Sequence, residues 1–223
     1  KIFSQVPTLS PDVDAPDRSG NNSMKKIIFS LIFLFTVYHY FQNREVSYGP
    51  GIFAPHEPDQ ENIKASQHFT FEDYKITPLA QFRLKARVLS REDYSLGRES
   101  DLSPMDLALG WGRMSDESVV REISISQSGR WYRLRWKQPP PIPLKEIETH
   151  SANMHLIPAT TEVESLMKKA RKGHVIALQG SLIEVEDSDG WRWRSSLSRG
   201  DTGARSCELI WVEDFKILQP NAS

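Results

Sequence analysis

The feature that most constrains this chain is a block in which Met24, Lys25 and Lys26 precede a nearly unbroken apolar run, Ile27–Phe41. An initiator residue, two positive charges and a hydrophobic segment in this order are typical of a membrane-targeting or membrane-anchoring element. As a helix the run reaches roughly 22 Å at about 1.5 Å per residue, less than the roughly 30 Å hydrocarbon core of a bilayer. This length fits a signal-peptide core or a slightly mismatched anchor.

Two observations favour an anchor that is not cleaved. No small-x-small cleavage pattern follows the run, and Tyr38, Tyr40 and Phe41 near its end resemble an aromatic belt at a membrane interface. We therefore predict a transmembrane signal anchor over residues 24–41, which contacts the lipid bilayer through Ile27–Phe41. Because the lysine pair stays in the cytoplasm, the protein is expected in the inner membrane, single-pass, with its C-terminal domain in the periplasm or extracytoplasmic space.

The segments on either side of the anchor lack periodic apolar patterns. Residues 1–23 are rich in Pro, Asp and small polar residues, so they bury too little surface to offset their ordering entropy. They are either a disordered tail or, as we favour, a segment upstream of a start at Met24. Residues 42–66 contain several Pro and Gly residues and are predicted to form an extended linker, and residues 219–223 a short tail.

Residues 67–218 have the size of one domain with a sizeable core. Cys207 is the one cysteine of the chain, which excludes an internal disulfide framework. The net charge of −1 gives no electrostatic argument for nucleic-acid binding. We therefore predict a single extracytoplasmic domain that does not bind nucleic acid.

Most of the apolar pattern in this domain has the period of strands. Apolar side chains occupy every second position from Phe82 to Val88, with Arg83, Lys85 and Arg87 on the opposite, wet face. Further strands are predicted at 123–125, 131–136, 175–178, 182–185, 191–197 and 207–212. Asp187–Gly190 has the composition of a hairpin turn, and Gly180 is predicted to mark a β-bulge.

Two segments carry helix signals. Ser103 is an N-cap candidate followed by Pro104, which predicts a short helix over residues 103–110. Thr161 and Glu164 form a capping box at the start of a second helix, predicted over residues 161–171. The sum is an α+β fold: a mainly antiparallel β domain with two or three short helices, preceded by one N-terminal transmembrane helix. A small, partly open barrel is one candidate for its C-terminal portion.

Candidate catalytic residues are few. If residues 151–155 are extended, Ser151, Asn153 and His155 share one face, where polar groups can orient an imidazole for acid–base work. The alternative is a hydrogen-bonded structural His. Asp201 opens a short Asp-Thr-Gly-Ala string like that of pepsin-like aspartic proteases, but the preceding residues are typical of a loop and no second copy exists. Cys207 is a nucleophile only if a base lies close, and is more simply a buried strand residue.

No sequence pattern indicates a metal or a cofactor. The His, Cys, Asp and Glu residues lack metal-ligand spacing, and no glycine-rich phosphate loop is present. An aromatic and basic pattern is more distinctive: Trp191 and Trp193 are predicted on one strand face and Arg192 and Arg194 on the other. Stacked Trp and Arg bind sugars, peptides or single-stranded nucleic acid, although packing in the core is the role that we favour for these Trp residues.

Four strings are similar to a family of uncharacterised bacterial membrane-anchored proteins: SPMDLALGWGRMSD, ISQSGRWYRLRW, SANMHLIPA and RSSLSRGDTGARSCELIWVED. The resemblance covers about residues 68–215 and implies no activity, substrate or catalytic residue. We expect a non-enzymatic, membrane-tethered domain that binds an envelope protein or a glycan, or that helps to assemble the envelope. The competing hypothesis is an envelope hydrolase that uses His155 with Ser151, Asp201 or Cys207.

Overall fold

A computed structural model describes residues 19–42, 44–64, 67–198 and 207–219, with the side chains of residues 24–37 in the first helix. The chain divides into two compact units, one up to Asn43 and one from Arg44 onward. The first unit contains helix α1, Ser19–Gln42. The segment predicted as an anchor, residues 24–41, is therefore helical. The helix begins upstream of Met24, within the segment predicted as a tail, and residues 1–18 lie outside the described residues.

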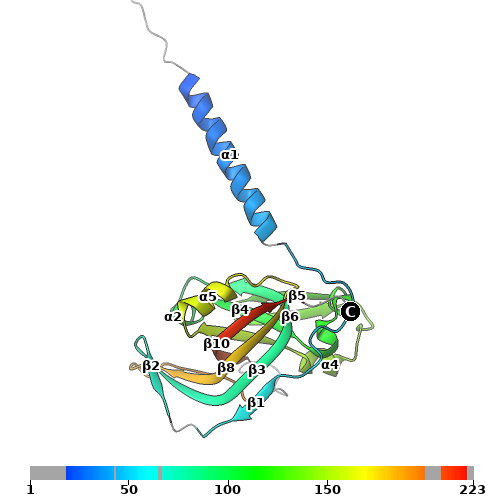
Figure 1. Cartoon of the computed structure of the whole chain (residues 1–223), viewed down its shortest axis with the longest axis vertical. Coiled ribbons are helices and arrows are strands. Elements are labelled where there is room, and N and C mark those ends of the chain that lie inside the picture. The colour runs from blue at the N-terminus through cyan, green and yellow to red at the C-terminus, as the bar shows by residue number, and fades with distance from the viewer. Residues whose placement is uncertain (1–18, 43, 65–66, 199–206, 220–223) are drawn as a thin grey trace, which may run out of the picture. The chain divides into compact units, whose positions relative to one another are not determined.

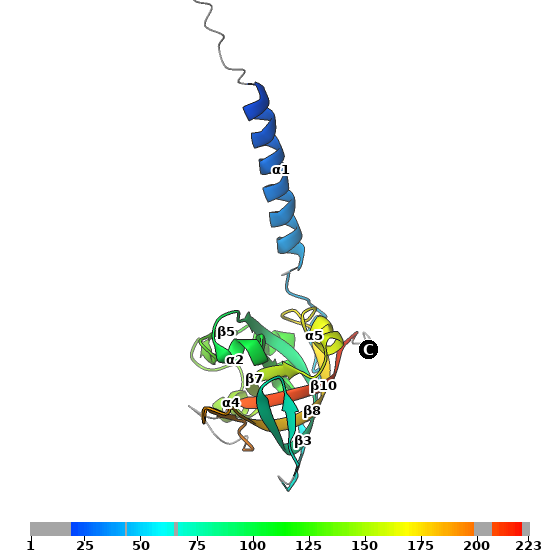
Figure 2. The same ribbon diagram turned by 90° about the vertical axis from the view of Figure 1, so that its left-hand side faces the viewer.

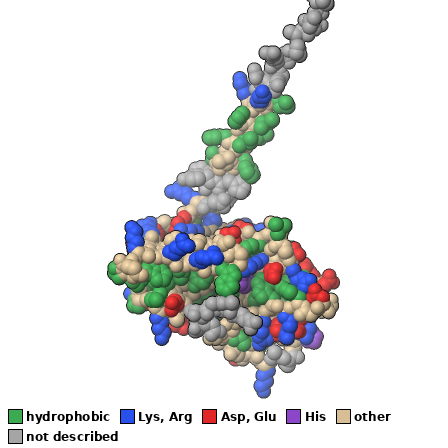
Figure 3. All heavy atoms as spheres, turned by 180° about the vertical axis from the view of Figure 1, so that it is seen from behind, with side chains coloured by type: hydrophobic (Ala, Val, Ile, Leu, Met, Phe, Trp, Pro, Cys, Tyr) green, Lys and Arg blue, Asp and Glu red, His purple; other side chains and the backbone are tan. Residues whose placement is uncertain are grey.

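Apart from Lys25, Lys26, Ser30 and Thr36, the described side chains of α1 are apolar, and Figure 3 shows them along the helix after basic side chains at its start. The large apolar side chains of α1 that are exposed are Met24, Ile27, Ile28, Phe29, Leu31, Ile32, Phe33, Leu34 and Phe35. No helix in the described part of the chain is both long enough and apolar enough to cross a bilayer.

The second unit is built mainly from strands (Figure 1). The strands are β1 (Asp59–Asn62), β2 (Phe69–Phe71), β3 (Tyr74–Asp93), β4 (Met105–Gly110), β5 (Ile123–Ser128), β6 (Trp131–Trp136), β7 (Ser151–Pro158), β8 (Val175–Glu186), β9 (Arg192–Arg194) and β10 (Glu208–Leu218). The short helices are α2 (Arg98–Leu102), α3 (Glu117–Val120), α4 (Leu144–Thr149), α5 (Thr161–Met167) and the 3₁₀ helix η1 (Gly112–Ser115). The prediction of a mainly antiparallel α+β domain is confirmed, with more short helices than expected.

Five of the strands close into a barrel. The order is β3-β4-β7-β10-β8, and β8 pairs back to β3. All of these pairings are antiparallel except that of β7 with β10, which lie side by side in Figure 2. Numbered along the chain, the barrel strands have the order 1-2-3-5-4, with α5 between the third and the fourth. This connectivity matches that of the five-stranded OB barrel.

Strand alternation decides which side chains fill the barrel. The even-numbered residues of β3 from Phe82 to Val88 are buried in the main core cluster, as their spacing predicted. Met105, Leu107 and Leu109 of β4 and Met154 and Leu156 of β7 enter the same cluster. The alternate residues of β4 and β7 therefore point to the outer face of the barrel.

The outer face of β4 and β7 is covered by the β5–β6 hairpin. Ala108 of β4 and Leu89 of β3 form an apolar cluster against which Tyr132, Leu134 and Trp136 of β6 pack. A third cluster, around Trp211 of β10, is covered by aromatic residues of β2 and β9 and their flanks. Parts of the inner and of the outer face of the barrel are therefore buried, and some polar residues on the outer face are enclosed.

The predicted helix over residues 103–110 is wrong, because most of this segment is strand β4. Its residues are buried on both faces, so the apolar run shows no alternation and resembles a helix segment. Hydrogen-bonded pairing to β3 on one side and β7 on the other overrides the local helix signals.

The prediction of an extended linker is also wrong, because residues 44–64, which we call the strap, pack on the barrel. Val46 N–H donates to Lys172 O, Ala54 is fully buried, and β1 pairs with β3. Gly173 permits the close approach, since a Cβ there would lie 1.8 Å from Val46 O. The strap covers one end of β3, so Arg87, predicted on the wet face, is 1% exposed.

Two local predictions shift position. The bulge expected at Gly180 lies instead in the facing strand, where the register shifts between Val212 and Asp214. Gly180 is where β10 comes closest, because a Cβ there would lie 1.9 Å from Trp211 O. Helix α5 is capped by Thr160, whose Oγ1 accepts from Val163 N–H at 3.3 Å, and it ends before the basic run.

Candidate functional site

A cleft of about 620 Å³ opens on the outer face of the barrel. Such a volume is within the range of about 300–1,000 Å³ typical of ligand sites. The cleft brings together five residues that the sequence analysis singled out: His155, Cys207, Trp193, Arg192 and Arg194. The other lining residues are Arg130, Trp131, Glu184 and Ser195.

The polar face predicted on β7 exists, but its members differ in surroundings. Ser151, Asn153 and His155 alternate with core residues and are all buried. Ser151 Oγ donates to Ile147 O at 2.7 Å, and Tyr132 Oη lies 3.3 Å from Ser151 Oγ. Ser151 and His155 are four residues apart along one strand, or about 13 Å, so Ser151 does not reach the imidazole.

Asp106 of β4 is the centre of the polar floor, and the sequence analysis missed it. The strand register places Asp106 opposite His155. Its Oδ1 accepts from Arg130 Nη1 at 2.6 Å, and its Oδ2 accepts from Asn153 Nδ2 at 3.3 Å. The carboxylate is fully buried, so these contacts replace its hydration. Its signal was hidden because the segment containing Asp106 was predicted to be helical.

His155 lies between this carboxylate and an aromatic ring. Nδ1 is 2.9 Å from Asp106 Oδ1, which is ion-pair distance, but the direction of the contact does not meet hydrogen-bond geometry. The ring packs on Trp193 with 5.1 Å between centroids. The imidazole therefore lies between Asp106 and Trp193 at the edge of the cleft, an arrangement that can serve either binding or proton transfer.

Arg130 connects the floor to the β5–β6 turn. Gly129 and Arg130 both have positive φ, which is the two-residue type I′ geometry that suits a twisted hairpin. Arg130 tolerates its φ of 68° because its backbone N–H donates to Tyr94 Oη at 3.0 Å and its guanidinium is bound to Asp106 and Ser103 O. An arginine held in strained backbone geometry by buried partners is common at binding sites.

The Arg130 guanidinium and several aromatic rings pack against one another in a row that begins at the wall of the cleft. The Arg130 guanidinium lies 3.9 Å from the Tyr94 ring centroid and 5.6 Å from that of Trp193. Trp193 packs on Trp191 at 6.2 Å, and Trp191 packs on Tyr74 at 6.0 Å. Trp191 is thus a packing residue outside the cleft. Trp131, which the sequence analysis did not single out for binding, lines the cleft and is 44% exposed.

Two arginines share one carboxylate on the same wall. Glu184 Oε1 accepts from Arg192 Nη2 at 2.7 Å, and Oε2 accepts from Arg194 Nη1 at 2.6 Å. Glu184 is nearly buried, whereas more than half of each arginine side chain is exposed. The alternation predicted for residues 191–194 holds, since the tryptophans stack together while the arginines point to Glu184.

Cys207 lines the cleft but is not an activated nucleophile. The pKa of its thiol is raised from an ordinary value of 9.0 to about 11, mainly by burial and in addition by the charges of Glu208 and Asp106. A nearby hydrogen bond from Asn153 opposes the shift only in part. At neutral pH the group is therefore a thiol, and thiolates rather than thiols attack substrates. Asp201 lies outside the described residues.

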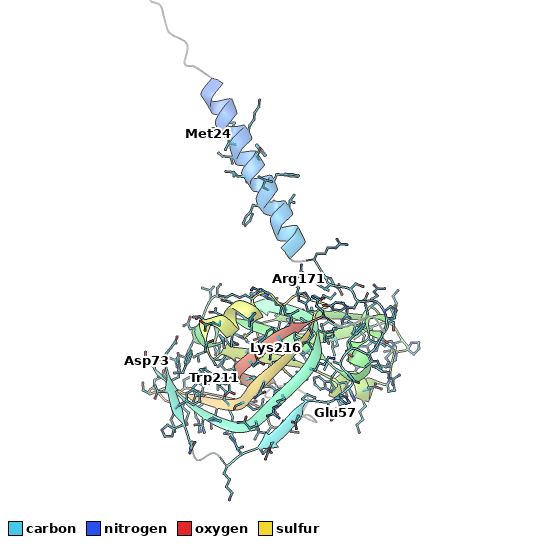
Figure 4. All side chains as sticks on the ribbon, viewed as in Figure 1. Met24, Glu57, Asp73, Arg171, Trp211 and Lys216 are labelled. Atoms are coloured by element: carbon cyan, nitrogen blue, oxygen red, sulfur yellow. The ribbon has the colours of Figure 1, made fainter. Side chains whose placement is uncertain are left out.

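A second hollow, of about 360 Å³, lies on the open face of β3, β8 and β10. It is lined by charged side chains that include Arg83, Asp214 and Lys216, and Figure 4 shows Lys216 over these strands and Glu57 near β1. Its three carboxylates and three cations include the ion pairs Asp59–Arg83 and Asp214–Lys216, and none of the candidate site residues lines it. Its side chains provide a charged control surface for tests of binding in the cleft.

Within the described ranges, no group of three or more His, Cys, Asp or Glu residues is placed to hold a metal ion. Comparison of the chain with protein-family models, with curated proteins and with solved structures finds no match.

Proposed function

We propose that this chain is a single-pass membrane protein whose C-terminal domain lies outside the cytoplasmic membrane and binds a ligand in the cleft around His155. The support for the anchor is the order of charge and apolarity in the sequence. Lys25 and Lys26 precede the apolar run, and the described apolar side chains of α1 are exposed on all sides of the helix. A helix that is apolar all round is stable when lipid or protein covers it.

The observation that carries the binding role is the division of the cleft into a fixed floor and open walls. Asp106, Asn153 and Arg130 satisfy one another beneath the surface. Trp131 and Arg194 on the walls remain exposed. A floor whose polar groups are already paired is rigid, so a ligand loses less free energy in ordering the site. The cleft is lined by His155 of β7 together with residues of β6, β8 and β9 and their flanks, and Asp106 of β4 lies beneath His155.

One contact favours a hydrolase as the second candidate. Asp106 lies against His155 at the edge of the cleft, and a carboxylate that orients a histidine is part of many acid–base sites. Neither of the two candidate nucleophiles that the structure describes is activated, because Ser151 is distant and the raised pKa keeps Cys207 as a thiol. Binding is therefore the preferred function.

Location is tested by cell fractionation and by reporter enzymes fused after Ser223. The full chain is expected in the membrane fraction after an alkaline carbonate wash, and a reporter active only outside the cytoplasm is expected to work. A variant with Phe33→Arg and Leu34→Arg is expected to leave the membrane fraction. A soluble wild-type chain, or a reporter active only inside the cell, would overturn the proposed location.

Binding is tested with an aromatic photo-crosslinking amino acid at position 131 of the full chain in intact cells, which keeps a flat ring where Trp131 lies. We expect an adduct at position 131 and none at position 83, which lines the charged hollow on the open face. Equal adducts at both positions, or none at either, would contradict a ligand site in the cleft. Release of product from esters or glycosides by wild type, lost in His155→Gln, would favour the hydrolase instead.

A further inference from the structure

We infer that the ligand of this cleft is an acidic oligosaccharide, with a sugar ring stacked on Trp131 and its acid group paired with Arg192 and Arg194. This inference rests on the proposed function, since it names the ligand class of the same cleft. It combines an exposed aromatic face with an excess of arginine beside it.

Trp131 supplies the aromatic face. A buried Trp contributes large packing area, yet this one lines the cleft and is 44% exposed. A pyranose ring has an apolar C–H face and a rim of hydroxyl groups, so it suits an indole with polar neighbours. Arg194 lines the same cleft with about half of its side chain exposed and offers guanidinium N–H groups to such a rim.

The charge of the lining side chains selects an acidic ligand. Three arginines and one glutamate line the cleft, and two further carboxylates lie buried beneath it. Of these, Asp106 is paired with Arg130, and Glu208 lies beside Cys207. On the exposed wall, Arg192 and Arg194 share Glu184, while Arg192 also contacts Glu186, which is paired with Lys75. Among the side chains that line this wall, two exposed arginines therefore share one carboxylate, and their outer N–H groups can pair with an acid group of a ligand.

The same side chains fit a nucleic acid less well. Affinity for single strands depends on a positively charged groove that follows many phosphates and on successive stacked bases. Here the chain has a net charge of −1, and over the surface seen in Figure 3 basic and acidic side chains are interspersed. The face of Trp193 is already occupied by His155. The cleft therefore offers Trp131 as one platform beside a compact charged wall.

The experiment measures binding of defined oligosaccharides to the full chain in lipid nanodiscs, by tryptophan fluorescence and calorimetry. The panel contains uronic-acid, sialic-acid and phosphosugar oligomers, each beside its methyl-esterified or dephosphorylated neutral form, and a single-stranded oligothymidylate. Variants are Trp131→Ala and Arg194→Gln. Matched controls are Leu96→Ala, which removes an apolar side chain that is 90% exposed elsewhere, and Arg83→Gln in the charged hollow. Near-ultraviolet circular dichroism verifies that each variant keeps its fold.

At least one acidic member is expected to bind, with its neutral form weaker by at least about tenfold, or about 1.4 kcal/mol. Trp131→Ala and Arg194→Gln are each expected to weaken it by a similar factor, and both controls to leave it unchanged. Equal binding of neutral and acidic forms, tighter binding of oligothymidylate, or binding by no oligosaccharide would overturn the inference. If the adduct at position 131 in cells persists in these cases, the proposed binding function stands and the ligand class is wrong. If that adduct is also absent, both fail.

Discussion

Arg87 and Glu117 form an ion pair in the interior of the domain, with Nη2 3.1 Å from Oε2 and side chains that are 1% and 4% exposed. The same carboxylate accepts from Ser47 Oγ at 2.7 and 2.9 Å and from Gly49 N–H at 3.2 Å. It also contacts Arg121, one helical turn later. The pair therefore joins β3, α3 and the strap at a single buried group.

Replacement of Arg87 by methionine is expected to lower the free energy of unfolding by about 3–5 kcal/mol, the range found when one partner of a buried pair is removed. The cause is a buried Glu117 carboxylate that loses its main cation and keeps only the exposed Arg121. Urea unfolding of the full chain, followed by tryptophan fluorescence, measures the change.

Lys85→Met serves as the control, since Lys85 is exposed on the same strand and a surface change is worth within about 0.5 kcal/mol. Addition of Glu117→Gln to Arg87→Met should restore part of the loss, because a neutral amide is cheaper to bury than a charge. A double variant no more stable than Arg87→Met alone would show that charge burial is not the cause.

The stability of the domain is expected to fall in acid through Glu117. Burial raises the pKa of this carboxyl, but hydrogen bonds from Ser47 and Arg87 and the Arg87 charge outweigh burial and hold the pKa below its ordinary value of 4.5. The unfolded chain then takes up the proton at higher pH than the folded chain, so stability is present above pH 4.5 and is lost as pH falls through the folded pKa.

The test compares wild type with Glu117→Gln by urea unfolding at several pH values. Asp116, Glu146 and Glu186 also have lowered pKa values, so the difference between the two proteins isolates Glu117. The advantage of wild type over the variant is expected to be largest near pH 7 and to shrink below pH 4.5. An advantage that stays constant down to the acid limit would contradict the role given to this carboxyl.

Local sequence patterns predicted the parts of this fold in which one face is wet. The alternation from Phe82 to Val88 and the strand at Trp131–Trp136 are visible because polar residues separate the apolar ones. The pattern fails at Met105–Gly110, where both faces are buried, and Asp106 was missed with it. It also fails for the strap, whose position depends on residues distant in sequence, such as Lys172 and Ser115.

The cleft shows the same division. His155 and the pattern of Trp193 with its neighbouring arginines were found from spacing on single strands. Arg130 and Asp106 were not, because their contact joins the β5–β6 turn to β4. A contact between elements far apart in sequence leaves no periodic signal, so only the folded chain reveals it.

Gly180→Ala is expected to destabilise the domain by at least about 3 kcal/mol, the upper end of the usual cost of overpacking. The new methyl group would lie 1.9 Å from Trp211 O and 2.9 Å from Trp211 C, and both atoms belong to the backbone of the paired strand. Gln179→Ala is the control, since Gln179 is the preceding residue of the same strand and is exposed. Thermal unfolding compares the two. A Gly180→Ala chain as stable as Gln179→Ala would mean that β10 can move away without loss.

Alkylation of Cys207 tests whether the cleft activates a nucleophile. With the thiol pKa raised to about 11 by burial, the thiolate fraction at pH 8 is roughly a hundredfold lower than for a thiol of ordinary pKa. Iodoacetamide is therefore expected to label the folded chain about a hundredfold more slowly than the urea-unfolded chain. Because Cys207 is the one cysteine present, intact mass reports its modification directly.

The labelling rate of the folded chain is expected to rise with pH up to about 11. If the protein only blocked the access of iodoacetamide to the thiol, labelling would be slow at every pH. Asn153→Ala provides a matched variant, because the hydrogen bond from Asn153 lowers the thiol pKa and its loss should slow labelling further. Rapid labelling of wild type at pH 7 would mean that the cleft holds a thiolate, and the hydrolase would then replace binding as the preferred function. Slow labelling would mean that Cys207 does not serve as the nucleophile of a hydrolase that uses His155. The contact between His155 and Asp106 would then be best explained as support for a bound ligand.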